Sequence, residues 1–323
     1  MRQNRYSKKA FLLITLLAFS LLLTACGVAT GDNENNNKGE VKIGYQKNGT
    51  TLTLKNNQDL QKELETEGYT VKWSEFNTGS SILEALNAGS IDFAGAGDIP
   101  SIFALAKGSD FKYIASELSS PSSQGILVSK DSNIKSIKDL KGKKIAFNKA
   151  SISQYLITQS LDSAGLTISD VEPVFLNPPD ASVAFEQGEV DAWVVWDPYL
   201  SVSESKGNII LQNPASVPYR SFYFTSSAFA KDHPELVEKF IEHLALVGKE
   251  IDKNPKEAAE LLQKETNIPK ETWEKVLSRK KSDVFFMDEK AVEDLQAQAD
   301  NLLKIGLTEN TVNINEFVWN PAD

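Results

Sequence analysis

Cysteine and histidine are scarce in this chain of 323 residues, which has one cysteine, Cys26, and two histidines, His233 and His243. A single cysteine has no partner for an internal disulfide. Metal sites of the zinc type need several cysteine or histidine ligands, and this composition argues against them. We therefore expect neither a bound metal nor another cofactor.

Clusters of basic residues are also missing. Lysine and arginine total 34 against 44 aspartates and glutamates, which gives a formal net charge of −10. Binding to nucleic acid requires clustered basic side chains that neutralise phosphates, and binding to anionic lipid requires a polybasic patch. The composition therefore argues against both of these partners.

Long apolar runs are absent except at the N-terminus, where Phe11–Ala25 is almost unbroken. This run is shorter than the roughly 20 apolar residues that a membrane-spanning helix needs. Four basic residues precede it, namely Arg2, Arg5, Lys8 and Lys9. A basic segment followed by a short apolar segment is typical of a secretory signal peptide, which we predict over residues 1–25.

The apolar run ends in Leu23-Thr24-Ala25-Cys26, which resembles the bacterial lipobox. Small residues let a peptidase cut before the cysteine, whose thiol receives a diacylglyceryl group. We predict lipidation of Cys26, a flexible tether rich in Asn and Gly over residues 26–40, and a place on the extracytoplasmic face of the cell membrane. Cleavage would take the net charge from −10 to about −14, because four basic residues leave. The alternatives are an incidental cysteine and an uncleaved anchor.

Strand-like and helix-like patterns alternate after the tether. Apolar alternation predicts strands at 41–45, 70–76, 91–94, 143–147, 171–176 and 190–195. Helix-like stretches separate them, at 57–67, 82–86, 100–107, 154–164 and 180–187. This βαβ rhythm is typical of a doubly wound α/β sheet. Amphipathic helices expected at 251–265, 270–278 and 288–305 suggest that the chain returns to complete a first of two lobes.

Polar loops follow four of these strands and precede helices, at 45–50, 77–81, 95–98 and 148–153. Ser, Thr and Gly at helix starts offer N–H groups and hydroxyls that hold a small anion, such as a sulfonate or phosphate, without a full positive charge. Ligands of such sheets bind outside the carboxyl ends of the strands. Plain helix capping is the alternative for any one loop.

Two aspartates stand at predicted helix starts, Asp98 before Ile99-Pro100 and Asp197 before Pro198. Each either caps its helix or accepts a bond from a ligand. Arg220 pairs either with the anion or with an acidic neighbour. Six aromatic residues are candidates for the wall of an apolar slot, about half of them being expected in the core: Tyr45, Phe76, Trp196, Tyr219, Phe222 and Tyr223.

Four segments resemble the solute-binding components of ABC importers for aliphatic sulfonates, a family related to taurine-, nitrate- and thiamine-precursor-binding proteins. They are IGYQK (43–47), SSILEALNAGSIDFAGAGDIPSIFALAKGSD (80–110), DLKGKKIAFNKASISQYLI (139–157) and DASVAFEQGEVDAWVVWDPYL (180–200). The resemblance implies the α/β, two-lobed periplasmic-binding-protein fold of type II, with mixed sheets flanked by helices. Lobe 1 would comprise residues 41–122 plus 222–323, and lobe 2 residues 123–221, with the ligand in a cleft between them.

The resemblance also implies that polar groups of matching loops grip the sulfonate. Carried onto this chain, the ligand-binding positions are Gln46, Ser80, Ser81, Gly97, Asp98, Ser122, Ser123, Gln124, Ser151, Ser153, Trp196 and Asp197. One departure matters, because many relatives have Glu-Thr-Pro where this chain has Asp98-Ile99-Pro100. The shorter carboxylate and the lost hydroxyl leave the ligand preference open.

We therefore predict a monomeric extracytoplasmic solute-binding protein of an ABC importer. It would close around an aliphatic sulfonate by bending near Gln124 and Tyr219–Tyr223, and deliver it to a membrane permease. The alternative ligands are taurine, nitrate and a thiamine precursor. An enzyme on the same fold is the rival class. The sequence shows no evident pair of nucleophile and base, which argues against an enzyme. A lipoprotein with only a surface interaction role is a third possibility.

Overall fold

The computed structural model describes residues 38–47, 49–211 and 217–321. Contacts divide the chain into Met1–Lys38 and Gly39–Asp323, and every element named below belongs to the second unit. The predicted signal peptide 1–25, the predicted lipidation site Cys26 and most of the predicted tether lie outside the described residues. Within the described ranges, no helix has both the length and the apolar character of a membrane span.

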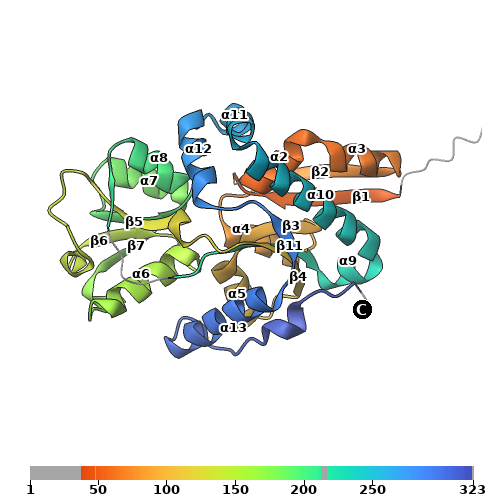
Figure 1. Cartoon of the computed structure of the whole chain (residues 1–323). Coiled ribbons are helices and arrows are strands. Elements are labelled where there is room, and N and C mark those ends of the chain that lie inside the picture. The colour runs from red at the N-terminus through yellow and green to blue at the C-terminus, as the bar shows by residue number, and fades with distance from the viewer. Residues whose placement is uncertain (1–37, 48, 212–216, 322–323) are drawn as a thin grey trace, which may run out of the picture. The chain divides into compact units, whose positions relative to one another are not determined.

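The first sheet has six strands in the order β11-β4-β10-β3-β1-β2. Strand β1 pairs in parallel with β2 and β3, whereas β10 is antiparallel to β3 and β4, and β11 is antiparallel to β4. Figure 1 shows these strands on the right of the view. Their bounds are β1 (Gly39–Tyr45), β2 (Tyr69–Glu75), β3 (Phe93–Gly97), β4 (Phe111–Glu117), β10 (Ser221–Ser226) and β11 (Val284–Phe286).

The second sheet has five strands in the order β7-β6-β8-β5-β9. Strand β6 is parallel to β7 and β8, and β5 is antiparallel to β8 and β9. Both sheets are mixed and carry helices, so the predicted α/β class with two sheets is confirmed. The bounds are β5 (Gln124–Val128), β6 (Lys144–Phe147), β7 (Glu172–Phe175), β8 (Ala192–Trp196) and β9 (Ile209–Ile210).

The chain crosses between the sheets twice, from β4 to β5 and from β9 back to β10. The returning strand β10 inserts between β3 and β4, so the first sheet contains strands from both ends of the chain. The two crossings run side by side, because the Ser120 amide donates to Tyr219 O at 2.7 Å and the Gln124 Nε2 donates to Val217 O at 3.0 Å. These paired segments are the connection on which any relative movement of the sheets depends.

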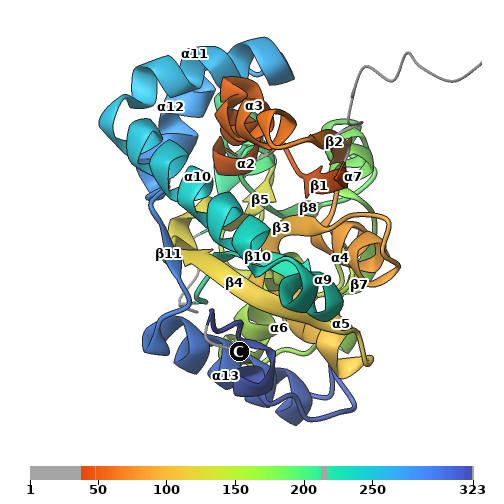
Figure 2. The ribbon, with the colours of Figure 1, turned by 90° about the vertical axis from the view of Figure 1, so that its right-hand side faces the viewer.

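Side chains of successive residues on β10 point to opposite faces of the first sheet, as the pleat of a strand requires. Phe222 and Phe224 pack into one apolar cluster, whereas Tyr223 packs into another. The first cluster includes residues of α4 (Gly79–Asn87), α5 (Asp98–Ala106) and α13 (Glu289–Lys304). The opposite face is covered by helices that run in Figure 2 from α11 and α12 at the upper left to α9 right of the centre: α2 (Gly49–Asn57), α3 (Asp59–Thr66), α9 (Ser227–Asp232), α10 (Pro234–Lys253), α11 (Pro255–Thr266) and α12 (Lys270–Arg279).

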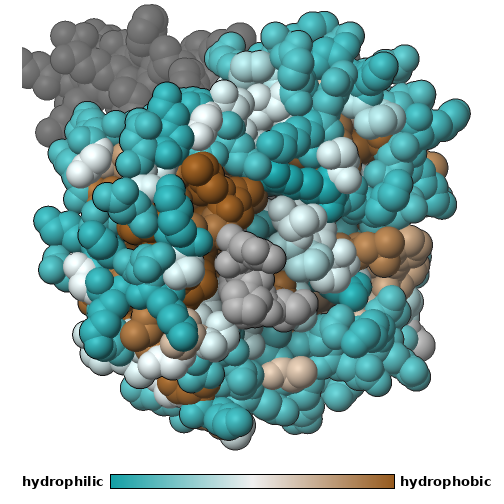
Figure 3. Space-filling model, turned by 60° about the vertical axis from the view of Figure 1, so that its left-hand side comes forward, coloured by the Kyte–Doolittle hydropathy of each residue, from teal (hydrophilic) through white to brown (hydrophobic). Residues whose placement is uncertain are grey.

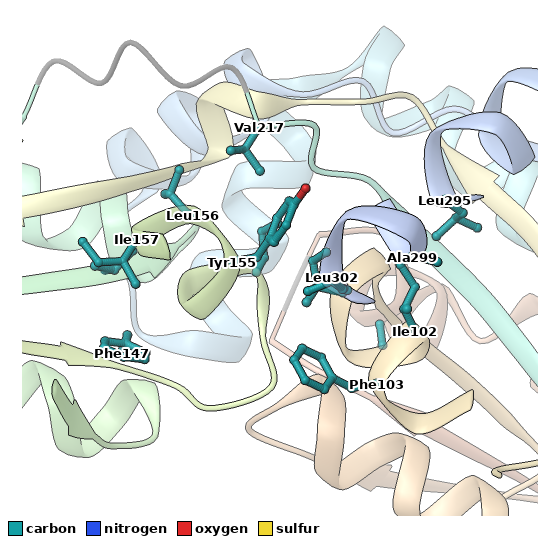
Figure 4. Packing of buried hydrophobic residues seen from close by; sticks show 14 of the residues in the cluster. Ile102, Phe103, Phe147, Tyr155, Leu156, Ile157, Val217, Leu295, Ala299 and Leu302 are labelled. Carbon is teal, nitrogen blue, oxygen red and sulfur yellow. The ribbon is translucent and has the colours of Figure 1, made fainter. Parts of the chain in front are cut away.

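The second sheet carries α6 (Ile152–Ser163), α7 (Pro178–Glu186) and α8 (Tyr199–Ser205). Its face toward α6 shares an apolar cluster with α5 and α13 of the first sheet, so one continuous core joins the two sheets. Figure 4 shows this junction, with Tyr155 of α6 lying toward Leu302 and Phe103. Four short 3₁₀ turns complete the description: η1 (Pro121–Ser123), η2 (Ile137–Leu140), η3 (Ile168–Asp170) and η4 (Ile314–Phe317).

Three local predictions need correction. Residues 45–50 were expected as a loop, but α2 begins at Gly49. Residues 95–98 were also expected as a loop, but β3 continues to Gly97 and α5 begins at Asp98. Strand β1 begins at Gly39, inside the predicted tether. Helix α2 contains several Thr residues, which have low helix propensity, and its residues Leu52 and Leu54 are fully buried. Tertiary burial therefore stabilises a helix that the local sequence does not indicate.

The surface agrees with the polar composition, since hydrophilic residues predominate on the face in Figure 3 and apolar ones form separate patches.

Candidate functional site

A cavity opens beyond the carboxyl ends of β1, β3 and β8. It encloses about 740 Å³ of empty space, counting solvent at its mouth, and its walls come from both sheets, both crossings and α12. Five of the predicted ligand-binding residues line it together: Gln46, Gly97, Ser123, Trp196 and Asp197. The cavity lies where ligands of open α/β sheets bind.

The first sheet contributes Gln46, which follows β1, and Gly97, which ends β3. The Gln46 Nε2 donates to Gly95 O at 3.0 Å, which fixes the side chain against β3. At Gly97 a Cβ would approach the ring of Tyr219 to 3.3 Å, so glycine allows the returning crossing to lie close to β3. Phe76 and Tyr219 supply aromatic surface to the same cavity.

The second sheet contributes Ser123, Trp196 and Asp197. The antiparallel pairing of β5 with β8 sets Gln124 opposite Trp196, and the Asp197 amide donates to Ser123 O at 2.8 Å. The buried hydroxyl of Ser123 has no hydrogen-bond partner among the described residues. A buried hydroxyl costs free energy unless it finds a partner, so Ser123 Oγ is a polar group available to a ligand in the cavity.

Asp197 is held by its own neighbours. Its Oδ1 accepts bonds from the Ser201 amide at 3.0 Å and the Ser201 hydroxyl at 2.7 Å, and Arg279 Nη1 lies 3.4 Å from both carboxylate oxygens. Burial raises the pKa of Asp197, and the bonds from Ser201 and the charge of Arg279 oppose that shift. These partners satisfy the Asp197 carboxylate at the start of α8 without a ligand. Contact between Asp197 and a ligand therefore stays a prediction.

Four predicted serines lie at two helix starts that meet from opposite sheets, outside the residues that line the cavity. Ser81 donates through its amide to Thr78 Oγ1, and Ser151 caps α6 by accepting from the Ser153 amide at 3.1 Å. Ser80 Oγ donates to Ala150 O at 3.3 Å, which joins the start of α4 to the loop before α6. The predicted convergence of the loops 77–81 and 148–153 is therefore seen. Ser80, Ser81 and Ser151 act as local caps and links, whereas the buried hydroxyl of Ser153, like that of Ser123, has no hydrogen-bond partner among the described residues.

Ser122 and Gln124 lie on the first crossing and serve structure. Ser122 Oγ donates to Arg279 O at 3.3 Å, and Gln124 Nε2 bonds the returning crossing. Neither is among the cavity-lining residues. Their predicted contact with a ligand stays a prediction.

Asp98 is buried behind the cavity wall and is not among the lining residues. Its carboxylate accepts from the Ile99 amide at 2.8 Å, the Arg220 amide at 3.2 Å and Gln298 Nε2 at 2.9 Å. Burial raises its pKa to about 6, and these three bonds lower it without offsetting the burial. The helix cap is Gly97, not Asp98, so the predicted capping role is corrected. Asp98 instead ties the returning crossing and α13 to the start of α5.

The alternatives for Arg220 and the aromatic residues are resolved by position. Arg220 Nη2 bonds Asp294 at 3.2 Å, so this guanidinium pairs with an acidic neighbour. Phe76, Trp196 and Tyr219 line the cavity, whereas the other three aromatic candidates pack in the apolar clusters, namely Tyr45, Phe222 and Tyr223.

Several lining residues were not predicted, and most come from segments distant in sequence. They are Asn77, Ser120, Tyr199, Ser221, Trp273 and Lys280. The short basic run Arg279-Lys280-Lys281, which the composition argument overlooked, was the one sequence signal for Lys280. Over the part of the chain that the structure describes, no group of three or more Cys, His, Asp or Glu side chains is placed to hold a metal. His243 instead bonds Glu63.

The family model described as NMT1/THI5 like matches residues 64–258. A protein of Escherichia coli (strain K12) named for aliphatic sulfonate binding is 34% identical over 285 residues, which cover 87% of this chain and 89% of that protein. A protein of Bacillus subtilis (strain 168) with the same name is 33% identical over 314 residues, covering 95% and 94%.

Solved structures agree with these relatives. The alkanesulfonate-binding protein SsuA from Xanthomonas axonopodis pv. citri bound to MOPS superposes with a TM-score of 0.81 at 31% identity, covering 88% of this chain and 99% of that one. The desulfurization enzyme DSZB has a TM-score of 0.64 at 13% identity, which is a likeness of fold alone. The same architecture therefore occurs in binding proteins and in at least one enzyme.

Proposed function

We infer that this chain, which belongs to the NMT1/THI5-like family and to the family of aliphatic sulfonate-binding proteins, captures an aliphatic sulfonate and delivers it to the permease of an ABC importer. One observation carries the inference most directly. A cavity between two sheets is lined by hydrogen-bonding and aromatic side chains, and it contains the buried, unpartnered hydroxyl of Ser123. Such a mixture of an apolar wall with a few polar groups is the ordinary make-up of a small-molecule site.

A sulfonate suits this lining. Its three oxygens accept hydrogen bonds, and donors are present in Ser123, Asn77 and Lys280. Its alkyl part would lie against Phe76, Trp196 or the other aromatic rings, whose burial of apolar surface favours binding. The identity of the sulfonate is left to the experiment below.

Capture is proposed to proceed by closure of the two sheets about their paired crossings. The bonds from Ser120 to Tyr219 and from Gln124 to Val217 make these crossings the hinge. A ligand that contacts both walls binds the closed form better than the open form, and so shifts the population toward it. The permease would then recognise the closed form.

Calorimetry with a panel of alkanesulfonates tests the proposal. We expect saturable binding of at least one alkanesulfonate, and weaker or no binding of nitrate and of pyrimidines. Taurine belongs in the panel, because its ammonium group would need a free carboxylate in the cavity. Binding of nitrate or a pyrimidine with no binding of any sulfonate would contradict the assignment. Turnover of a bound sulfonate would support the rival enzyme class, which the fold also hosts.

We also propose that the mature chain is tethered through Cys26 on the extracytoplasmic side of the cell membrane. The motif Leu23-Thr24-Ala25-Cys26 and the basic and apolar segments before it support this. A tether would raise the effective concentration of the protein near its permease. Cys26→Ser should abolish lipid labelling and release the chain from the membrane fraction. A Cys26→Ser protein that still carries lipid would exclude the anchor, whatever the ligand.

A further inference from the structure

Lys280 is a largely buried cation in the cavity wall. It follows α12 in the first-sheet unit, its side chain is 11% exposed, and it is among the residues that line the cavity. The Lys280 Nζ donates to Glu117 Oε2 at 2.6 Å. An ammonium group has three donors, and this is its one acceptor among the described residues. Two of its three donors therefore stay available.

The carboxylate of Glu117 is fixed from its other side. Its Oε1 accepts from the Thr50 hydroxyl at 2.6 Å and the Tyr223 hydroxyl at 2.8 Å. The Glu117 side chain is 3% exposed, and its residue ends β4, a central strand of the first sheet. The Glu117 carboxylate thus has rigid partners, and it holds the end of a flexible lysine at one place.

Other cations near the cavity are placed differently. Lys47 lines the cavity, but its side chain is 43% exposed and pairs with Glu75 at 3.2 Å. Arg279 is occupied by Asp197, Ser201 and Glu204 and is not among the lining residues. Lys280 is therefore the cation that combines burial, a fixed position and access to the cavity.

The charge of the chain favours such a group. The formal net charge of −10, which becomes about −14 after the proposed cleavage, creates a potential that repels an approaching anion. Neutral donors can hold an anion, and a largely buried ammonium adds a direct attraction to an anionic oxygen at short range. The charge of Glu117 offsets part of the desolvation cost of the Lys280 ammonium while the cavity is empty.

We propose that Lys280 is the residue that selects anions in this cavity, with Glu117 as the residue that positions it. The ammonium keeps its bond to Glu117 and directs its remaining donors to an anionic oxygen. This inference rests on the proposed function and adds the group that distinguishes a sulfonate from an uncharged analogue of the same shape.

The test compares Lys280→Gln with Lys281→Gln, which removes the same charge from the exposed neighbour. Affinity for an alkanesulfonate, and for the matching uncharged alkyl methyl sulfone, is measured by calorimetry at two salt concentrations. Loss of a charge-assisted hydrogen bond predicts about 10- to 100-fold weaker sulfonate binding in Lys280→Gln. Sulfone binding should change little, and Lys281→Gln should bind both ligands as the wild type does.

The discriminating readout is the ratio of sulfonate to sulfone affinity, which a merely structural lysine would not alter. An unchanged ratio in Lys280→Gln would overturn the inference. Lys280→Gln leaves the buried carboxylate of Glu117 unpaired, which can prevent folding. The double variant Lys280→Gln/Glu117→Gln removes both charges. We expect the same fall in the ratio of sulfonate to sulfone affinity in this variant. Failure of the wild type to bind any sulfonate would instead contradict the proposed function itself.

Discussion

Arg279, the last residue of α12, lies with its Nη1 atom 3.4 Å from both carboxylate oxygens of Asp197, which follows β8. The two residues belong to different sheets, and Arg279 also contacts Ser201 and Glu204 of α8. Figures 1 and 2 show α12 at the top of the molecule and α13 at the bottom. The sheets are therefore joined by ion pairs on one side and by the apolar α5–α6–α13 junction on the other.

This polar bridge should matter more than the exposed ion pair beside it. Arg279→Gln leaves the buried carboxylate of Asp197 without its cation, and we expect the free energy of unfolding to fall by about 3 kcal/mol. Lys275→Gln is the matched control, because Lys275 pairs with Glu204 at 3.0 Å but is 46% exposed. Its loss should cost under about 1 kcal/mol. Urea unfolding measures both, and equal losses would contradict the distinction.

Replacement by alanine should have different effects at two predicted ligand serines, lowering affinity at Ser123 and stability at Ser151. Ser123 Oγ is buried without a partner, so Ser123→Ala should leave stability almost unchanged and weaken sulfonate binding about 10-fold. Ser151 caps α6, so Ser151→Ala should cost about 1 kcal/mol of stability. It should change affinity less than Ser123→Ala does. Thermal unfolding and calorimetry on both variants check this, and the reverse pattern would place the ligand at the start of α6.

The sequence predicts elements and local contacts well, because their causes lie within a few residues. Apolar alternation predicts β1, β2 and β6 within two residues of their bounds. The Ser151 cap of α6 is likewise a local feature, because its hydroxyl accepts from the amide of Ser153, two residues later. Helix α2 was missed because its stability comes from burial of Leu52 and Leu54 in a distant core.

The cavity was predicted only in part, because contacts in and around it join residues that lie far apart in the chain. Arg279 is 82 residues from Asp197, and Lys280 is 163 residues from Glu117. The helical segment that carries them looks generic, and its position depends on the insertion of β10 between β3 and β4. Neither spacing nor periodicity indicates that insertion. Contacts that close over such distances follow from the assembled sheet, not from a motif.

Gly248 lets α10 pass close to the segment that carries Lys280. A Cβ at this position would lie 2.0 Å from Ser282 O, a backbone atom that cannot move aside alone. Gly248→Ala gains about 1 kcal/mol of helix propensity, but the overlap should cost more, giving a net loss of about 1 to 2 kcal/mol. Leu246→Ala, at an exposed position of the same helix, should stay within about 0.5 kcal/mol of the wild type. A Gly248→Ala protein that is more stable than the wild type would show that the backbone at Ser282 moves aside at little cost.

The last prediction concerns pH and Asp98. Burial raises the pKa of this carboxyl from 3.8 to about 6, so between these values the native chain binds more protons than the unfolded chain. Its contribution to stability is therefore complete below about pH 4 and is lost as the pH rises through 6. A shift of this size corresponds to about 3 kcal/mol.

Asp98→Asn cannot titrate, so the difference in unfolding free energy between wild type and variant isolates this one group. We expect the wild type to lose about 3 kcal/mol relative to Asp98→Asn between pH 4 and pH 7. Other groups titrate alike in both proteins and cancel in the difference. Urea unfolding across this range is the measurement. Parallel stability curves would mean that Gln298 and the Arg220 amide stabilise the ionised carboxylate enough to offset its burial.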